Sequence, residues 1–282
     1  EVILCSFGDM LRVPGSQKSL LEVKAEGADV RILYSPLEAV KIAEDNPDRE
    51  VVFFAVGFET TAPANALSVV HAHRRGVKNY SILASHVLVP PAIKAVIDDE
   101  ESKIDGFLAA GHVCTIMGNA EYHLISAKYK VPIVVTGFEP LDVLQGIMMV
   151  IRQLEQSKSS VENQYARIVR EDGNLEAQKV INEVFEVRNQ MWRGIGEIPE
   201  SGYAVREKYA EFDAAKKYNV TIDEAPENPD CISGQIMKGI KKPFECSQFG
   251  KKCKPTNPLG APMVSSEGAC AAYYHFSGLV EA

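Results

Sequence analysis

The sequence has no long hydrophobic run, and this absence bears first on membranes. Its apolar stretches, such as residues 147–151, are far shorter than the roughly 20 residues that a helix needs to cross a bilayer. No secretory or transit signature stands at the start. Basic residues are also in deficit, with 30 Lys and Arg against 38 Asp and Glu, for a net charge of −8. Since a phosphate backbone needs a basic face, we expect neither a membrane nor a nucleic acid as partner.

Phosphate-binding fingerprints are missing too. The chain has no GxGxxG and no GxxxxGK[ST]. Gly57 and Gly137 each follow an apolar stretch, but neither belongs to such a motif. An α/β oxidoreductase that uses a nucleotide stays open as an alternative, and the missing fingerprint counts against it.

Apolar stretches alternate with amphipathic ones along the first 155 residues. Hydrophobic residues make up 46% of the chain and charged residues 24%, which is ordinary for a soluble globular protein of two or three domains. Strict alternation of strand and helix, with nearly continuous apolar strands, indicates an α/β fold with parallel sheets covered on both faces. The expected strands are 2–7, 30–34, 51–56, 80–85, 106–110 and 133–136. The expected helices are 19–26, 37–44, 64–75, 92–98, 120–128 and 140–155.

The pattern loosens after residue 157. We expect a helix over 174–187, a loop around 194–202 and a short helix over 203–215. The single tryptophan, Trp192, is interpreted as a packing residue. Two earlier segments, 51–61 and 132–142, share the plan strand, Gly-Phe-Glu, helix, which indicates a partial internal duplication.

Four of the six cysteines lie in the last fifth of the chain, with the spacing C-x14-C-x6-C-x16-C. They are Cys231, Cys246, Cys253 and Cys270. The surrounding prolines and glycines are typical of turns rather than long regular elements. A segment of this kind buries little apolar surface, so it needs a covalent cross-link or a metal centre, here called a staple, to stabilise a single conformation.

Three staples are compatible with four cysteines: an iron–sulfur cluster, a zinc ion or two disulfides. Zinc usually takes its ligands from close C-x2-4-C pairs, which the segment lacks, whereas wide spacing suits a cluster held by separate loops. Cys5 and Cys114 fall at probable strand ends without obvious partners, which favours a reducing, cytoplasmic compartment over disulfides. A zinc-stapled interaction protein remains the second alternative.

Several polar residues occupy positions where an α/β sheet places ligands, beyond the carboxyl ends of its strands. Asp9 and Glu59 each follow an expected strand, and His112 follows Gly111 at the end of another. An imidazole there could relay protons or bind metal, although a hydrogen bond to a loop carbonyl is the simpler interpretation. Asp9 is explained equally simply as the cap of a turn. Glu267 could cap a helix from Gly268 or stand beside a cluster.

Five strings of the sequence resemble the hydrogenase maturation factor HypD family, in one order and over the whole length. They are CSFGDMLRVPG (5–15), GFETTAP (57–63), GFEPLD (137–142), ENQY (162–165) and VSSEGACAA (264–272). The resemblance implies two Rossmann-like α/β domains and a smaller domain with a [4Fe-4S] cluster. It also implies a scaffold that works with a HypC-type chaperone, receives cyanide from a HypE-type donor and helps to assemble the Fe(CN)2CO unit of [NiFe]-hydrogenase.

The sequence departs from the family at its front. The family's CGxHxH-type and GPGCPVC motifs precede CSFGD, and neither is present here. We therefore expect an N-terminally truncated chain that does not itself hold the Fe(CN)2CO iron, which would require the full-length protein. The expected domains are 1–48, the remainder of a first, incomplete α/β domain; 49–215, a second α/β domain with a helical extension; and 216–282, the four-cysteine domain.

The resemblance also implies roles for individual residues. The cluster ligands would be Cys231, Cys246, Cys253 and Cys270. Four polar residues would face the cleft between the domains: Asp9, Glu59, His112 and Glu267. Asp9 and His112 would handle protons or support the iron, and Glu267 would be a neighbour of the cluster. The family role is that of an assembly platform, with a redox step at the cluster as a possible activity.

Overall fold

A four-stranded parallel sheet in the order β2-β1-β3-β4 forms the first lobe of the computed structural model, which describes residues 2–220 and 228–276. Its strands match the four predicted here to within one residue at each end. They are β1 (Val2–Phe7), β2 (Val30–Leu33), β3 (Glu50–Gly57) and β4 (Tyr80–His86). The helices of this lobe are α1 (Leu20–Ala25), α2 (Pro36–Asp45) and α3 (Ala62–Arg75). The domain boundary expected after residue 48 passes through this sheet, because β1 and β2 precede it and β3 and β4 follow it.

Local signals set the limits of these helices. The Ser19 hydroxyl accepts a hydrogen bond from the Glu22 backbone amide, and the Glu22 carboxylate accepts one from the Ser19 backbone amide, so a capping box starts α1. Ser35 caps α2 and is followed by Pro36 in the first turn. Gly76, with a φ of 67°, ends α3 in the left-handed conformation that glycine adopts most easily.

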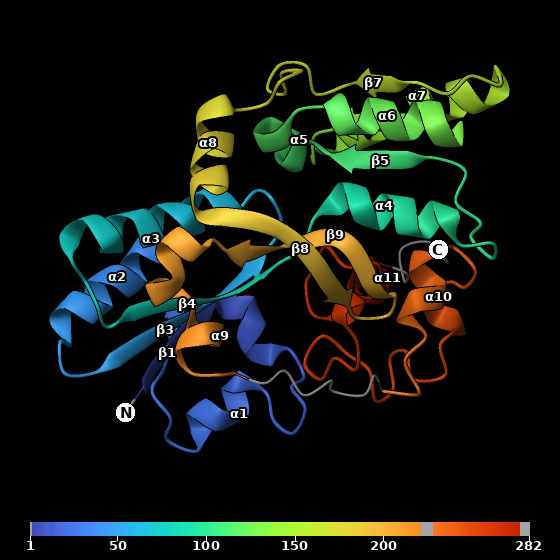
Figure 1. The fold of residues 1–282 in the computed structure, drawn as a ribbon. Helices are drawn as coiled ribbons and strands as arrows, with labels where there is room; N and C mark the ends of the chain where they lie inside the picture. Colours follow the sequence, from blue (N-terminus) through green and yellow to red (C-terminus); the bar gives the residue numbers. More distant parts are fainter. Residues whose placement is uncertain (1, 221–227, 277–282) are drawn as a thin grey trace.

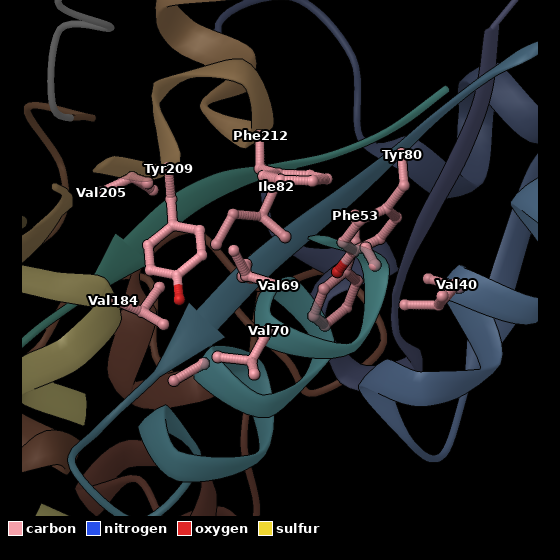
Figure 2. Packing of buried hydrophobic residues seen from close by; sticks show 14 of the residues in the cluster. Val40, Phe53, Val69, Val70, Tyr80, Ile82, Val184, Val205, Tyr209 and Phe212 are labelled. Carbon is pink, nitrogen blue, oxygen red and sulfur yellow. The ribbon is translucent and has the colours of Figure 1, made fainter. Parts of the chain in front are cut away.

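The core of the first lobe combines side chains from distant parts of the chain (Figure 2). Phe53, Tyr80 and Ile82 from the sheet are fully buried against Val69 of α3. Later residues complete this core, among them Val184, Val205, Tyr209 and Phe212. The Tyr80 hydroxyl lies 2.7 Å from the Ser68 hydroxyl, so the one polar end of this tyrosine is satisfied inside the core.

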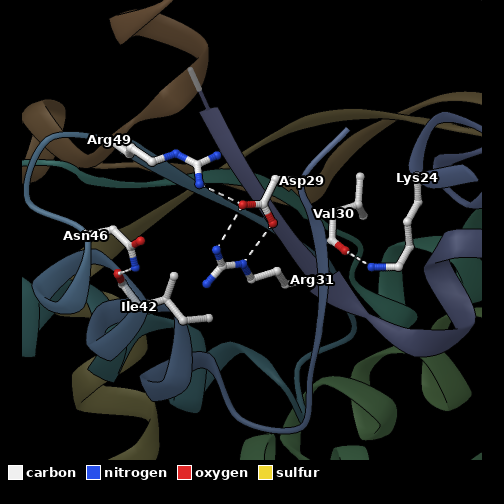
Figure 3. A network of polar contacts seen from close by, with 7 residues as sticks. All are labelled: Lys24, Asp29, Val30, Arg31, Ile42, Asn46 and Arg49. Carbon is white, nitrogen blue, oxygen red and sulfur yellow. Dashed lines mark hydrogen bonds and ion pairs between the residues drawn. The ribbon is translucent and has the colours of Figure 1, made fainter. Parts of the chain in front are cut away.

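An ion-pair network at the outer edge ties the starts of two strands together (Figure 3). The Asp29 carboxylate, before β2, accepts two hydrogen bonds from Arg31, at 2.8 and 2.9 Å, and one from Arg49, before β3, at 2.8 Å. These guanidinium groups lower the pKa of Asp29 to about 2. Lys24 donates to the Val30 carbonyl and fastens α1 to β2.

The second lobe is built on a three-stranded parallel sheet in the order β5-β6-β7. Its strands are β5 (Phe107–Ala110), β6 (Ile133–Thr136) and β7 (Val161–Asn163). Its helices are α4 (Val89–Asp98), α5 (Gly111–Met117), α6 (Ala120–Tyr129) and α7 (Pro140–Glu155). The prediction of an α/β fold with Rossmann-like parallel sheets is confirmed. Sequence patterns missed β7, which has three residues and no apolar run, and α5, which has seven residues and no side-chain cap.

A buried carboxylate fixes the start of α7 to the loop after β7. The Asp142 side chain is 5% exposed and pairs with both terminal nitrogens of Arg167, at 2.9 and 2.6 Å. Gln164 donates a third hydrogen bond to the same carboxylate, at 2.8 Å. The pKa of Asp142 falls to about 2, chiefly because of Arg167 and then because of Gln164. Two strings of the sequence, GFEPLD and ENQY, thus meet in one network.

A helix and a hairpin connect this lobe back to the first (Figure 1). Helix α8 (Leu175–Val184) leads into an antiparallel pair, β8 (Phe185–Trp192) and β9 (Gly196–Val205). The predicted helix over 174–187 therefore ends early, and the predicted loop around 194–202 is wrong. The hairpin depends on contacts that no local pattern reports: β9 packs on β4, and the Trp192 indole donates to the Ser201 hydroxyl at 2.9 Å.

The predicted helix over 203–215 is correct only in its second half. Strand β9 extends to Val205, and a 3-10 helix, η2 (Glu207–Phe212), and α9 (Ala214–Lys217) follow. The four-cysteine segment then contains only short elements: α10 (Ser233–Met237), η3 (Pro243–Glu245), η4 (Ala261–Met263) and α11 (Ala269–Phe276). Within the expected 216–282 domain, residues 221–227 and 277–282 lie outside the described residues.

Helix α7, with 16 residues, leaves part of an apolar face uncovered, including Leu141, Leu144 and Met148. It is nevertheless too short to cross a bilayer. Across residues 2–220 and 228–276, no helix combines the length and the apolar character that a membrane span requires.

We expect Phe53→Ala to lower the free energy of unfolding by about 3–5 kcal/mol, because it leaves a cavity in the core of the first lobe. Phe58→Ala, at a side chain 42% exposed just beyond the same strand, is the matched control and should cost about 1 kcal/mol or less. Urea unfolding followed by circular dichroism measures both. Equal effects of the two substitutions would contradict this packing.

We expect Asp142→Asn to lower the melting temperature at neutral pH, because Arg167 loses its ionised partner. A carboxyl group whose pKa is lowered in the folded state stabilises the fold above its unfolded pKa, and this contribution disappears as the pH falls toward about 2. The wild-type protein should therefore lose stability in acid more steeply than the variant. Glu139→Gln is the control, since the Glu139 side chain is 79% exposed and lies 3.7 Å from Arg167. An Asp142→Asn protein that melts like Glu139→Gln at neutral pH would contradict the role of the pair.

Candidate metal centre

Four thiols from separate turns line one small, largely apolar cavity at the end of the molecule. Cys231 precedes α10, Cys246 follows η3, Cys253 lies in the next turn, and Cys270 is in the first turn of α11. Apolar side chains close the cavity around them, from Ile236, Phe249, Leu259 and Met263. All six cysteines of the chain are free thiols. The predicted group of four is thus brought together, and the two-disulfide alternative is not adopted.

Backbone hydrogen bonds shape the turns that carry these thiols. Between Cys246 and Cys253, the Phe249 amide donates to the Cys246 carbonyl at 3.1 Å, and the Gly250 amide donates to the Cys253 carbonyl at 3.0 Å. Gly260 approaches Cys231 so closely that a β-carbon there would lie 2.4 Å from the Cys231 sulfur. Only glycine fits at that position, because any larger residue would displace the thiol or the turn.

The electrostatics of the cavity favour neutral thiols as long as no positive charge is present. The pKa of Cys270 is raised to about 12, chiefly by burial and then by the neighbouring Cys253, Cys231 and Cys246. Burial also raises the pKa of Cys253, while the Leu259 amide, 3.4 Å from its sulfur, acts in the opposite direction. Four mutually repelling thiolates in one apolar cavity require a bound cation or cationic cluster to become stable.

A single metal ion fits this arrangement poorly. Zinc binds thiolate at about 2.3 Å, so four sulfurs around one ion lie within about 4 Å of one another. Within the part of the chain that the structure describes, no three His, Cys, Asp or Glu side chains converge closely enough to hold one ion. The four sulfurs therefore line one cavity without forming such a single-ion site.

Two of the predicted polar residues lie beside this segment. His112 is in the first turn of α5, where its ring packs edge-on against Phe138 at 4.9 Å. Burial lowers the pKa of His112, and the carboxylate of Glu267 acts to raise it. Glu267 stands three residues before Cys270, in a turn where its amide donates to the Ser265 hydroxyl at 3.2 Å. The fold thus brings His112 of the second lobe close to the turn that leads into the fourth cysteine.

Asp9 is exposed in a 3-10 helix, η1 (Gly8–Arg12), where its carboxylate accepts a hydrogen bond from the Met10 amide at 3.0 Å. This is the simple capping role, although the following loop, at Pro14 and Gly15, borders a groove beside Cys231. Arg193, from the turn of the β8–β9 hairpin, also lines that groove.

Glu59 is buried rather than open to a cleft. Gly57, with a φ of 153°, permits a turn in which a β-carbon would lie 2.1 Å from the Thr61 hydroxyl, and this turn directs Glu59 inward. The Glu59 side chain is 1% exposed, and its Oε1 accepts a hydrogen bond from the Val89 amide at 2.8 Å. Its other oxygen, Oε2, is buried without a partner. Burial raises the pKa of Glu59 to about 7.

Sequence reasoning did not assign a role to the Asp142–Arg167 pair, or to Tyr122 and Cys114, which are buried near Glu59. The available signal was the family strings GFEPLD and ENQY, which contain or adjoin the pair. Cys114, expected at a strand end, lies instead in α5 and is fully buried.

Comparisons with known proteins agree on one family. A family model named HypD, described as "Hydrogenase formation hypA family", matches residues 1–277. The chain is 48% identical to the hydrogenase maturation factor HypD of Azotobacter vinelandii over 282 residues, covering 98% of this chain and 74% of that protein. It is 45% identical to HypD of Escherichia coli K12, with 98% and 74% covered, and 45% identical to HypD2 of Bradyrhizobium diazoefficiens, with 98% and 75% covered. Matches of this extent and identity show that the chain belongs to the HypD family of hydrogenase maturation factors.

Proposed function

We propose that this chain acts in hydrogenase maturation as a cluster-bearing scaffold on which the Fe(CN)2CO unit of [NiFe]-hydrogenase is assembled. Membership of the HypD family supports the maturation role. The observation that carries the scaffold proposal is the convergence of four free thiols, from four separate turns, on one apolar cavity. The chain then serves as an assembly platform, with a redox step at the cluster as its chemical contribution.

The group that we assign to the cavity is a [4Fe-4S] cluster, with Cys231, Cys246, Cys253 and Cys270 as ligands. When bound, it would supply electrons to the assembly reaction or accept them. The apolar walls exclude water, and the Leu259 amide stabilises negative charge on the Cys253 sulfur. Free thiols throughout the chain are consistent with work in a reducing, cytoplasmic compartment.

The proposed partners are a HypC-type chaperone and a HypE-type cyanide donor. Membership of the HypD family is the only argument for these two partners. We treat the Fe(CN)2CO iron as cargo. We assign it no ligand among the residues of this sequence.

His112 and Glu267 are the residues that we propose to move protons near the cluster. The exposed Glu267 carboxylate acts to raise the pKa of the half-buried His112, and both residues lie next to the segment that carries the thiols. Such a pair can accept or release a proton when the charge of a neighbouring cluster changes. Asp9, exposed in η1, would act from the segment that leads to Pro14 and Gly15 in the groove beside Cys231.

The two alternatives are weaker on physical grounds. A zinc-stapled interaction protein needs sulfurs that meet at one ion, and in residues 2–220 and 228–276 no such group occurs. An α/β oxidoreductase with a bound nucleotide needs a phosphate-binding turn, and the sequence contains no GxGxxG.

Anaerobically purified protein should be brown and contain about four iron and about four sulfide per chain. Cys253→Ala should bleach the colour and lower the iron content, because it removes one ligand. Cys5→Ala is the matched control, since Cys5 is buried in the first lobe away from the cavity, and it should keep the colour. Zinc at about one per chain, or unchanged absorbance in Cys253→Ala, would overturn the cluster assignment.

A further inference from the structure

The two lobes are joined at a junction where a carboxyl group is part of the connection. Strand β4 of the first lobe continues through residues 87–88 into α4 of the second. Three hydrogen bonds hold this crossing: Val87 amide to Gly57 carbonyl at 3.0 Å, Leu88 amide to Ser201 carbonyl at 2.8 Å, and Val89 amide to the Glu59 carboxyl at 2.8 Å. Only the third uses a side chain, and it caps the first turn of α4.

Among the described residues, no cation is found to act on the Glu59 carboxyl group. Glu121 of α6 raises its pKa, and Glu59 in turn raises the pKa of Tyr122 of α6, Cys114 of α5 and Tyr203 of β9. Glu121, the acidic member, is itself paired with Lys94 at 2.7 Å. On the far side of Tyr203 lies His86, whose pKa burial lowers to about 4, so that its ring is neutral at ordinary pH.

Two buried polar atoms near this junction are unsatisfied. The Glu59 Oε2 and the His86 Nδ1 have no hydrogen-bond partner. Burying a protonated carboxyl group without a partner costs far less free energy than burying a carboxylate, because the carboxylate needs water or a cation to balance its charge. Ionised Glu59 therefore favours any opening of the junction that admits water.

We propose that Glu59 is a positioning residue that latches the second lobe onto the first when it carries a proton and loosens the junction when it ionises. The latch would set the placement of α5, which carries His112 toward the cysteine segment. This inference stands apart from the proposed function, because it depends on the lobe junction and not on the cluster.

The sign of the pH dependence follows from the elevated pKa. Between the ordinary pKa of 4.5 and about 7, the folded protein keeps the Glu59 proton whereas the unfolded chain has lost it. The contribution of Glu59 to the free energy of unfolding is therefore highest at the low-pH end of this window, and it falls as the pH rises toward about 7. Above that value the carboxylate is ionised in both states, and the latch is open.

Glu59→Gln tests the latch, because glutamine keeps an oxygen for the Val89 amide and carries no charge at any pH. Melting temperature and hydrogen exchange of peptides from residues 87–129 should be followed from about pH 4.5 to about 8.5. In the wild-type protein, exchange corrected for its intrinsic rate should rise several-fold across this range, and in Glu59→Gln it should stay flat. At the high end the variant should melt higher than wild type by roughly 3–8 °C, and at the low end the two should agree within about 1 °C.

Two further variants separate the latch from a purely structural role. Glu176→Gln, at an exposed first-turn position of α8, should follow the wild-type pH profile. Glu59→Ala removes the acceptor for Val89 as well, so it should melt below Glu59→Gln at every pH. Iron and sulfide content should be the same in Glu59→Gln and wild type, which keeps this test distinct from that of the cluster. The proposal is overturned if Glu59→Gln retains the wild-type pH dependence, melts no higher than wild type at high pH, or fails to fold.

Discussion

The convergence of four thiols on one cavity is the constraint on which the last fifth of the chain depends. The apolar cluster of this segment is small, and two of the cysteines, Cys253 and Cys270, belong to it beside Ile236, Met263 and Ala271. The same side chains therefore serve as core and as candidate ligands. A segment with short helices and few buried apolar groups gains little stability from hydrophobic burial, so a group bound to the sulfurs would also stabilise its turns.

The two lobes use similar sequence for different purposes at the ends of their strands. Gly-Phe-Glu follows β3 and again β6, yet Glu59 is 1% exposed whereas the Glu139 side chain is 79% exposed. The difference arises from what lies opposite each turn. Glu59 meets the start of α4 and the β9 strand at the lobe junction, and Glu139 faces solvent at the start of α7, next to Arg167. A shared local motif thus gives one lobe a buried acid and the other an exposed helix start.

The β8–β9 hairpin connects all three parts of the molecule (Figure 1). Its strand β9 packs on β4 of the first lobe and on α4 of the second, and its turn at Gly194 packs against Ser233 at the start of α10. Movement between the lobes would therefore be transmitted to the cysteine segment through packed backbone. The proximity of His112 to Glu267 depends on the same arrangement, because each residue belongs to a different part.

The sequence by itself determined the strands of both sheets except β7, most of the helices and the membership of the four-cysteine group. Those features depend on local apolar periodicity and on residue type, which are readable along the chain. Tertiary structure alone decided the rest. It placed β1 and β3 in one sheet across the expected domain boundary, formed the hairpin where a helix end and a loop were expected, and buried Glu59 while leaving Asp9 exposed. These outcomes depend on which elements pack against one another, and burial and pairing between distant segments leave no periodic signal in the sequence.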